Sequence, residues 1–395
     1  MRKAIIIYGG PLGLGIVRSL GEKGIKSIVI HEDDEEVAVH SKYVFHKVKI
    51  KNYLDRKELY DLLIKNKKKW KGLLVIPGSD ESALALAYYR KQLSKHYVLP
   101  VSGYNTLSKV VDKKETYKLA DKAGVPRPKT WCPKTLKEIH NLKREIIFPC
   151  ILKPHLRHNF YKIFKTKLFY INNFQELKKK FMLCIKHKVD VMISELIPGE
   201  DTNLYGYSFY IDKNYKFRGG MLDQKLRQAP PKFGVGRVIR TLHNDEIAAL
   251  AKKFLKQSPK YTGPGKIEFK YDARDGKYKL IEMNARIILW VHFMAKLGIN
   301  YPYLMYEDWI NSKQIKIKDY KDNIYWMHLY NDVLYFMSKK RKLDNLTFGK
   351  FISPYLHRKV LAIESIKDPM PMIIHWRSNA NDFFNWVNKK LFRKK

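Results

Sequence analysis

The sequence has few cysteines, few acidic residues and no long apolar segment. Its three cysteines, Cys132, Cys150 and Cys184, are too few and too far apart for a disulfide framework or a CxxC metal knuckle, which favours a reducing compartment. No uninterrupted apolar run approaches the roughly 20 residues of a membrane span. The first apolar run, Ala4–Tyr8, is too short for a signal-peptide core of about 7–15 residues. We therefore expect a cytoplasmic protein.

The shortage of acidic residues leaves a strongly basic chain. Its 395 residues include 38 Asp plus Glu against 77 Lys plus Arg, which gives a net charge of +39, and a hydrophobic fraction of 45% excludes disorder. Residues 42–71 carry a net charge of +8 and residues 134–188 one of +11, so about half of the excess lies in two stretches. Such a balance suits nucleic acid, an anionic membrane or a polyanionic substrate.

The first hundred residues predict a parallel α/β unit. Apolar runs at Ala4–Tyr8, Ser27–Ile30 and Gly72–Ile76 alternate with helical stretches, as in a parallel sheet. After the first strand, Gly10, Gly13 and Gly15 follow a GxxGxG spacing rather than the GxGxxG of dinucleotide-binding proteins. The pattern favours a plain tight turn over NAD binding.

The next two hundred residues predict a second, mixed α/β unit. A helix opens at Val111-Asp112-Lys113 and ends before Gly124. The predicted strands are Phe148–Pro154, Val191–Ile197, Tyr205–Ile211, Phe217–Met221, and a hairpin of Gly265–Asp272 and Lys279–Asn284 joined at Asp275-Gly276. Between the first two strands lie a basic loop, 155–167, and a basic helix, 173–188.

Three oxygen-bearing side chains are expected to share one face of that hairpin. Glu268 and Glu282 lie on its two strands, and Asn284 is two residues after Glu282, so side-chain alternation places it on the same face as Glu282. Mg²⁺ takes oxygen ligands and shares them with substrate phosphates. The alternative is that both glutamates are ordinary solvent-facing strand residues.

The order of these parts resembles the ATP-grasp superfamily over about residues 1–310. A strand lysine (Lys153) comes first, then the segment Glu195–Asp201, then the hairpin residues with Arg286. The sequence looks most similar to carboxylate–amine ligases of the D-aspartate-ligase-like kind. The resemblance implies three regions: an N-terminal parallel α/β (pre-ATP-grasp) domain at 1–110, an ATP-grasp domain at 111–320 with a lid subdomain at about 128–200, and a basic, aromatic C-terminal extension at 321–395.

The resemblance also implies a role for each matching residue. These residues are Lys113 and Lys153 for the ATP phosphates, Glu195, Leu196 and Ile197 for the adenine, Glu200 or Asp201 for the ribose, Glu268, Glu282 and Asn284 for Mg²⁺ (with Mn²⁺ as a substitute), and Arg286 for the γ-phosphate. Two features depart from the family pattern. Residues 155–167 contain no glycine, although this loop is normally glycine-rich, and Ser194 stands where Glu or Gln is common.

The implied reaction joins a carboxylate to an amine through an acyl-phosphate, with release of ADP and phosphate. For an acidic substrate we consider Lys225, Arg227, Arg237 and Arg240, with a solvated basic loop as the alternative. Asp80 is a candidate for the amine, or else a helix cap, and His292 is expected to be a packed histidine. The competing function is a non-catalytic nucleotide-binding or nucleic-acid-binding protein on the same fold; for the ligase, nucleic acid is not expected as a partner.

The end of the chain carries one further pattern. Apolar residues recur at helical spacing above a basic terminus: Ala380, Phe383, Phe384, Val387 and Leu391, followed by Arg393, Lys394 and Lys395. Such a helix can lie on an anionic membrane as a peripheral contact, although packing on its own domain is the commoner arrangement. The sequence leaves the oligomeric state and the identity of both substrates open.

Overall fold

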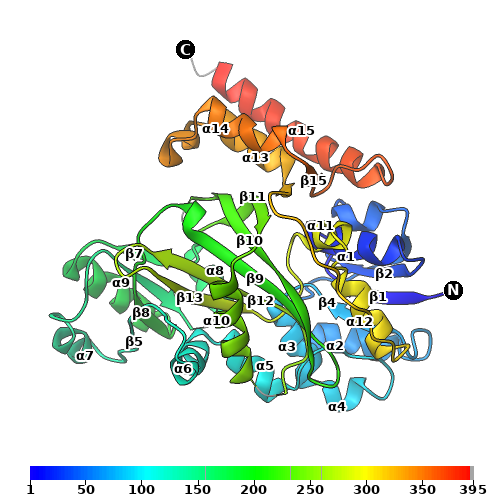
Figure 1. Cartoon of the computed structure of the whole chain (residues 1–395), viewed down its shortest axis with the longest axis horizontal. Helices are drawn as coiled ribbons and strands as arrows, with labels where there is room; N and C mark the ends of the chain where they lie inside the picture. Colours follow the sequence, from blue (N-terminus) through cyan, green and yellow to red (C-terminus); the bar gives the residue numbers. More distant parts are fainter. Residues whose placement is uncertain (156, 232, 259, 392–395) are drawn as a thin grey trace.

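The N-terminal region forms a four-stranded parallel sheet (Figure 1). The computed structural model describes residues 1–155, 157–231, 233–258 and 260–391, with side chains except those of 157–159 and 381–391. The sheet order is β3-β2-β1-β4. The elements are β1 (Lys3–Ile7), α1 (Pro11–Gly21), β2 (Lys26–His31), η1 (Val37–His40), β3 (Val44–Lys49), α2 (Arg56–Lys65), β4 (Leu74–Pro77), α3 (Asp80–Tyr88), α4 (Arg90–Leu93) and α5 (Tyr104–Val111). The predicted parallel unit is confirmed; β3, an edge strand with mostly exposed or half-buried side chains, was not predicted.

The glycines after β1 serve close packing. A Cβ at Gly13 would lie 1.9 Å from the carbonyl oxygen of Tyr8, and one at Gly15 would lie 2.9 Å from Cγ1 of Val291. The missing side chain at Gly13 therefore lets helix α1 begin close to Tyr8, and the missing side chain at Gly15 lets the same helix pack against Val291. This packing supports the interpretation as a plain tight turn.

Helix α6 (Lys113–Ala123) leads into a lid built on an antiparallel sheet of order β5-β8-β6-β7. Asp112 caps the helix, and Gly124 ends it in the left-handed conformation (φ 59°), as the sequence predicts. The lid elements are β5 (Thr130–Trp131), α7 (Leu136–Asn141), β6 (Cys150–Pro154), α8 (Arg157–Phe164), β7 (Phe169–Ile171), α9 (Phe174–Lys186) and β8 (Val191–Glu195). The loop predicted at 155–167 is wrong, because α8 occupies most of it and buries Phe160 in the lid core.

The central layer is a seven-stranded sheet of order β13-β12-β9-β10-β11-β14-β15. Its first part contains η2 (Asp201–Asn203), β9 (Leu204–Ile211), β10 (Phe217–Ala229), β11 (Val235–Leu242), α10 (Asp245–Lys256), β12 (Gly263–Asp272) and β13 (Lys277–Asn284), followed by α11 (Val291–Lys296) and α12 (Tyr301–Trp309). The predicted hairpin is confirmed. Strand β10 runs eight residues beyond its predicted end, and β11, which begins at Val235, was not predicted.

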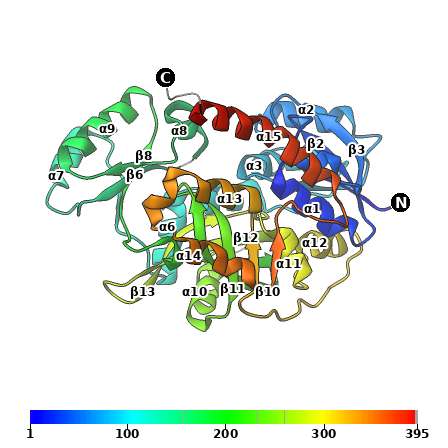
Figure 2. The same cartoon turned by 90° about the horizontal axis from the view of Figure 1, so that it is seen from above.

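The C-terminal extension adds the last two strands to this sheet and caps one end of the molecule (Figures 1 and 2). It consists of β14 (Tyr325–Met327), α13 (Leu329–Met337), η3 (Lys339–Asp344), α14 (Phe348–Ile352), η4 (Ser353–Leu356), β15 (Lys359–Leu361) and α15 (Met370–Leu391). No helix within the described residues is both long enough and apolar enough to span a bilayer.

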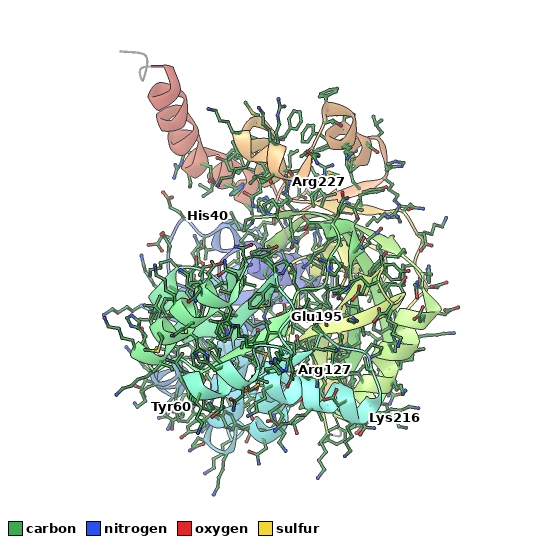
Figure 3. All side chains as sticks on the ribbon, turned by 90° about the vertical axis from the view of Figure 1, so that its left-hand side faces the viewer. His40, Tyr60, Arg127, Glu195, Lys216 and Arg227 are labelled. Carbon is green, nitrogen blue, oxygen red and sulfur yellow. The ribbon has the colours of Figure 1, made fainter. Side chains whose placement is uncertain are left out.

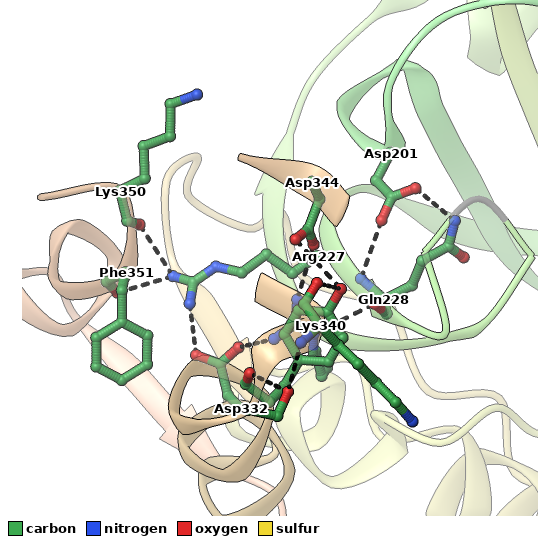
Figure 4. A network of polar contacts seen from close by, with 11 residues as sticks. Asp201, Arg227, Gln228, Asp332, Lys340, Asp344, Lys350 and Phe351 are labelled. Atoms are coloured by element: carbon green, nitrogen blue, oxygen red, sulfur yellow. Dashed lines mark hydrogen bonds and ion pairs between the residues drawn. The ribbon is translucent and has the colours of Figure 1, made fainter. Parts of the chain in front are cut away.

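A buried carboxylate fastens the extension to the central sheet (Figure 4). Asp332 on α13 is fully buried and accepts hydrogen bonds from Arg227 at 2.5 Å, from Arg237 at 3.0 Å and from the Tyr355 hydroxyl at 2.9 Å. Arg227 also donates to the carbonyl oxygen of Phe351 at 2.9 Å. Two strand arginines and three segments of the extension thus meet at one point.

A second buried carboxylate fastens the extension to the N-terminal domain. Asp368 accepts from Nε of Arg18 at 2.9 Å, from the Ser41 hydroxyl at 2.8 Å and from the backbone N–H of Lys42 at 2.9 Å. Both Arg18 and Asp368 are about 1% exposed. The extension therefore bridges the first domain and the central sheet.

We predict that Asp332→Ala destabilises the protein strongly, because it removes the carboxylate that two buried guanidinium groups share. Losing one partner of a buried ion pair costs about 3–5 kcal/mol in the free energy of unfolding. Urea unfolding of the full chain measures this cost. The control, Asp319→Ala, removes an exposed carboxylate and should change the value by less than about 0.5 kcal/mol. A loss below about 1 kcal/mol in Asp332→Ala would contradict this description of the junction.

Candidate functional site

One cavity of about 260 Å³ lies between the lid, the β12–β13 hairpin and strands β10 and β11. Figure 3 looks toward the lid and shows Glu195, at the end of lid strand β8, near the middle of the molecule. Ten of the sequence-predicted residues line the cavity: Lys113, Lys153, Glu195, Leu196, Ile197, Lys225, Glu268, Glu282, Asn284 and Arg286. The structure thus gathers residues from six separate segments of the chain.

The two glutamates lie directly opposite each other on the hairpin. Glu268 pairs with Glu282 across β12 and β13, and Lys266 pairs with Asn284 two positions away. Side-chain alternation puts all four on the cavity face, and each of them lines the cavity. Two carboxylates directly opposite each other repel, so this arrangement requires positive charge nearby.

Two buried lysines supply positive charge to Glu268. Nζ of Lys225 lies 2.9 Å from one carboxylate oxygen, and Nζ of Lys266 lies 3.5 Å from the other. Burial would raise the pKa of Glu268, but the two ammonium groups outweigh burial and lower it. For Lys225, burial would lower the pKa, and the Glu268 carboxylate outweighs it and raises the pKa. Glu268 is therefore held as a carboxylate and Lys225 as an ammonium.

Lys266 is held by a second buried acid. Its Nζ donates to Asp223 at 3.1 Å and lies 3.9 Å from the centre of the Trp290 ring, whose Nε1–H donates to the other oxygen of Asp223 at 3.1 Å. Gly206 makes room for this side chain, because a Cβ there would lie 1.7 Å from Cε of Lys266. The sequence interpretation missed Lys266, Asp223 and Trp290. The alternation that linked Glu282 to Asn284 would also have linked Glu268 to Lys266.

On the lid side, Lys153 is buried and tied to the hairpin. Its Nζ donates to the Tyr117 hydroxyl at 2.8 Å, and that hydroxyl donates to the carbonyl oxygen of Ile281 at 2.8 Å. Ile281 is an extra residue in the ladder, since Glu268 pairs with Glu282 but Phe269 pairs with Leu280. Burial, reinforced by nearby Lys113, lowers the pKa of Lys153 to about 7.

Lys113 and Arg286 are two further cations of the cavity lining. Lys113 begins α6, and its Nζ lies 3.2 Å from Glu282. Nε of Arg286 lies 3.5 Å from Asp80, too far for a good hydrogen bond, and both Nε of Arg286 and Oδ1 of Asp80 are buried without a hydrogen-bond partner in the described structure. Arg286 lines the cavity, whereas Asp80 is not part of its lining.

The end of β8 and the segment after it line the cavity through Glu195, Leu196 and Ile197. The Glu195 carboxylate accepts from the backbone N–H of Lys129 at 3.0 Å and from Arg274 at 2.5 Å, so this side chain is occupied in holding the lid. Glu200 and Asp201 lie outside the cavity lining, and Asp201 accepts from the side-chain amide of Gln228 at 2.7 Å. A contact from either of them to a ribose stays a prediction.

Of the four basic residues considered for an acidic substrate, only Lys225 lines the cavity. The expectation for Arg237 is not met, because its side chain is buried against Asp332 and Asp344 beneath the extension. Arg227 also pairs with Asp332, and Arg240 donates a hydrogen bond to Gln224 at 2.7 Å. His292 is buried and lies 3.2 Å from Glu22, so it is a packed histidine as expected.

The donor set of the cavity fits a divalent cation and phosphates. Two carboxylates and one amide offer oxygen ligands on one face, while Lys113, Lys153 and Lys225 surround them with ammonium groups. The described residues contain no cluster of three or more His, Cys, Asp or Glu side chains that could hold a metal alone. A cation here needs Asn284 and further oxygen ligands, as Mg²⁺ does when it is shared with phosphates.

Known proteins resemble the chain both in sequence and in fold. No protein-family profile matches it. The D-aspartate ligase of Enterococcus faecium (strain Aus0004) is 26% identical over 269 residues, which cover 65% of this chain and 63% of that ligase, so the match spans less than two thirds of the relative. The L-amino acid ligase from Bacillus licheniformis superposes with a TM-score of 0.61 at 17% identity, covering 80% of this chain and 75% of that one.

Two further structures were solved with bound nucleotide. The N5-carboxyaminoimidazole synthetase from Staphylococcus aureus, complexed with ADP, gives a TM-score of 0.61 at 16% identity, covering 80% of this chain and 78% of that one. The biotin carboxylase domain of the Hydrogenobacter thermophilus 2-oxoglutarate carboxylase, complexed with MgADP, gives a TM-score of 0.64 at 18% identity. The match covers 81% of this chain and 73% of that one. The chain shares the ATP-grasp fold with these proteins. In sequence, the chain is similar to the D-aspartate ligase named above.

We predict that Lys153→Met stabilises the protein, and more so at low pH. The folded pKa of Lys153, about 7, lies below its unfolded value, so the cost of burying its charge is fully present below pH 7 and is lost as the pH rises toward 10.5. The stability gain over wild type should therefore shrink by about 2–3 kcal/mol between pH 7 and pH 9. Urea unfolding at both pH values measures it, and the exposed Lys137→Met is the control. A gain that does not change with pH would contradict the buried position of the ammonium.

Proposed function

We propose that the chain is an ATP-dependent carboxylate–amine ligase that produces ADP and phosphate. The observation that carries the proposal is the cavity face on which Glu268, Glu282 and Asn284 lie among Lys113, Lys153 and Arg286. The ATP-grasp fold and the sequence similarity to D-aspartate ligase support the same activity.

ATP and Mg²⁺ fit the residues present. Glu268, Glu282 and Asn284 would hold the metal, for which Mn²⁺ is a substitute, and Lys113 and Lys153 would hold phosphate oxygens. Leu196 and Ile197 line the cavity where backbone groups would meet the adenine edge. The metal would neutralise charge on the transferring phosphoryl group.

The chemistry we propose for this face is a two-step amide synthesis. The substrate carboxylate takes the γ-phosphoryl group of ATP, which leaves ADP and an acyl-phosphate; the amine then attacks the acyl carbon, loses a proton and releases phosphate. Lys225 and Arg286 line the cavity and would stabilise the negative charge that develops during transfer. Arg237 has no part in it, because Asp332 and Asp344 hold it outside the cavity.

For the substrates, we propose an amino acid or amine and an acidic small-molecule, cell-wall or polysaccharide precursor. The relative's name indicates aspartate as one substrate of that enzyme. The basic cavity of this chain suits a carboxylate-bearing acceptor. Cytoplasmic location and a membrane contact through the C-terminal helix stay predictions, and the apolar side chains proposed for that contact, beyond Ala380, lie outside the described residues.

We expect the wild type to release phosphate from Mg·ATP when amino acids are paired with sugar-acid and peptidyl acceptors. Glu282→Ala should release phosphate at least about 100-fold more slowly, because metal stabilisation of the transferring group is worth several kcal/mol. Glu246→Gln, on an exposed helix turn, is the control and should retain the wild-type rate. A phosphate-release assay measures both.

The competing function makes an opposite prediction. A non-catalytic protein would release no phosphate with any substrate pair. A nucleic-acid-binding protein would also retain DNA or RNA in a salt-dependent way that Glu282→Ala leaves unchanged. Either result, with folded wild-type protein, would contradict the ligase proposal.

A further inference from the structure

Large apolar side chains are exposed at one end of the molecule. Within residues 337–359, which we call the 337–359 surface, Leu343 is 71% exposed, Phe348 is 67% exposed and Leu356 is 78% exposed, and Met337 is also exposed. Single exposed apolar residues are common on soluble proteins, but a group of them marks an interaction surface.

Ring contacts join the elements of this surface. The ring of Phe336 on α13 stacks on Phe351 at 4.1 Å between centroids and lies 6.3 Å from the exposed Phe348 on α14. The Arg341 guanidinium, on η3, lies 4.9 Å from the Phe336 ring. Helix α13, η3 and α14 therefore present their apolar and basic side chains together.

The same surface is strongly basic. Seven exposed Lys or Arg residues belong to it: Lys339, Lys340, Arg341, Lys342, Lys350, Arg358 and Lys359. Its one acidic residue is Asp344. The carboxylate of Asp344 forms an ion pair with Arg237 at 3.2 Å and accepts a hydrogen bond from the Tyr335 hydroxyl at 3.2 Å. The apolar groups are thus surrounded by positive charge that is not neutralised within the segment.

The neighbouring helix α15 also exposes apolar side chains. Along its described side chains Ile373 and Trp376 are exposed, whereas Ile374 is buried against the body of the protein. Figure 2 looks onto this end of the molecule, with α13, α14 and α15 in front of the central sheet. The extension therefore presents one basic and apolar end, fastened to the rest by Asp332 and Asp368.

We propose that the 337–359 surface binds an anionic lipid bilayer peripherally. Leu343, Phe348 and Leu356 would enter the boundary between headgroups and acyl chains, and the lysines would contact lipid phosphates. A second copy of the chain would bring two strongly positive faces together, which repel. Nucleic acid would pair with the basic side chains and stack on Phe348, but it offers no apolar environment for Leu343 and Leu356. The proposal is independent of the ligase function.

Vesicle sedimentation of the full-length chain tests this proposal. We expect binding to vesicles of phosphatidylcholine and phosphatidylglycerol at 3:1, weak binding to phosphatidylcholine alone, and weaker binding in 0.5 M salt. Lys339→Gln/Lys340→Gln/Lys342→Gln should weaken binding at least about 100-fold, since each charge near the surface contributes about a fivefold factor. Leu343→Ser/Phe348→Ser/Leu356→Ser should also abolish sedimentation.

The matched control is Ile147→Ser/Met182→Ser/Ile185→Ser, which changes three exposed apolar residues of the lid and should bind vesicles as the wild type does. Circular dichroism and urea unfolding verify that each variant is folded. Failure of the wild type to bind anionic vesicles overturns the proposal, whether the surface then proves to retain RNA or to mediate self-association. Wild-type binding by the folded Leu343→Ser/Phe348→Ser/Leu356→Ser variant overturns it as well.

Discussion

The repulsion between Glu268 and Glu282 is the constraint on which the site depends. The register of β12 and β13 places the two carboxylates opposite each other at the wall of a cavity, where they are poorly screened by water. Lys225 on β10, Lys266 on β12 and Lys113 on α6 bring compensating charge. A divalent cation between the carboxylates would serve the same purpose, so the arrangement is prepared for a metal.

The surrounding structure holds those lysines in place. Asp223 and Trp290 hold Lys266, and glycine at position 206 leaves space for it. The hydroxyl of Tyr117, on α6, connects Lys153 of the lid to the carbonyl oxygen of Ile281, which the register shift in the hairpin makes available. Strand β13 therefore carries Glu282 and also the carbonyl group through which Tyr117 holds the lid lysine.

Sequence reasoning could reach the parts of the site that depend on local pattern. Strand alternation and a tight turn place Glu282 and Asn284 on one face, and the apolar run around Lys153 marks its strand. Sequence reasoning could not predict ion pairs between residues that are distant in the sequence. Arg237 was expected in the site because nothing near it in the sequence shows that Asp332, on a later helix, would bury its charge. Residues 155–167 were expected as a basic loop between two strands, whereas most of them form helix α8, which buries Phe160 in the lid core.

Nucleotide binding followed by isothermal titration calorimetry tests the central claim most directly. The full chain is titrated with a non-hydrolysable ATP analogue and Mg²⁺ at pH 8, in two buffers of different ionisation enthalpy. Lys153 is mostly neutral at this pH, and phosphate contact would restore its charge, so we predict saturable binding with uptake of close to one proton, lost in Lys153→Met. Absence of saturable binding, or binding without proton uptake, would contradict the account.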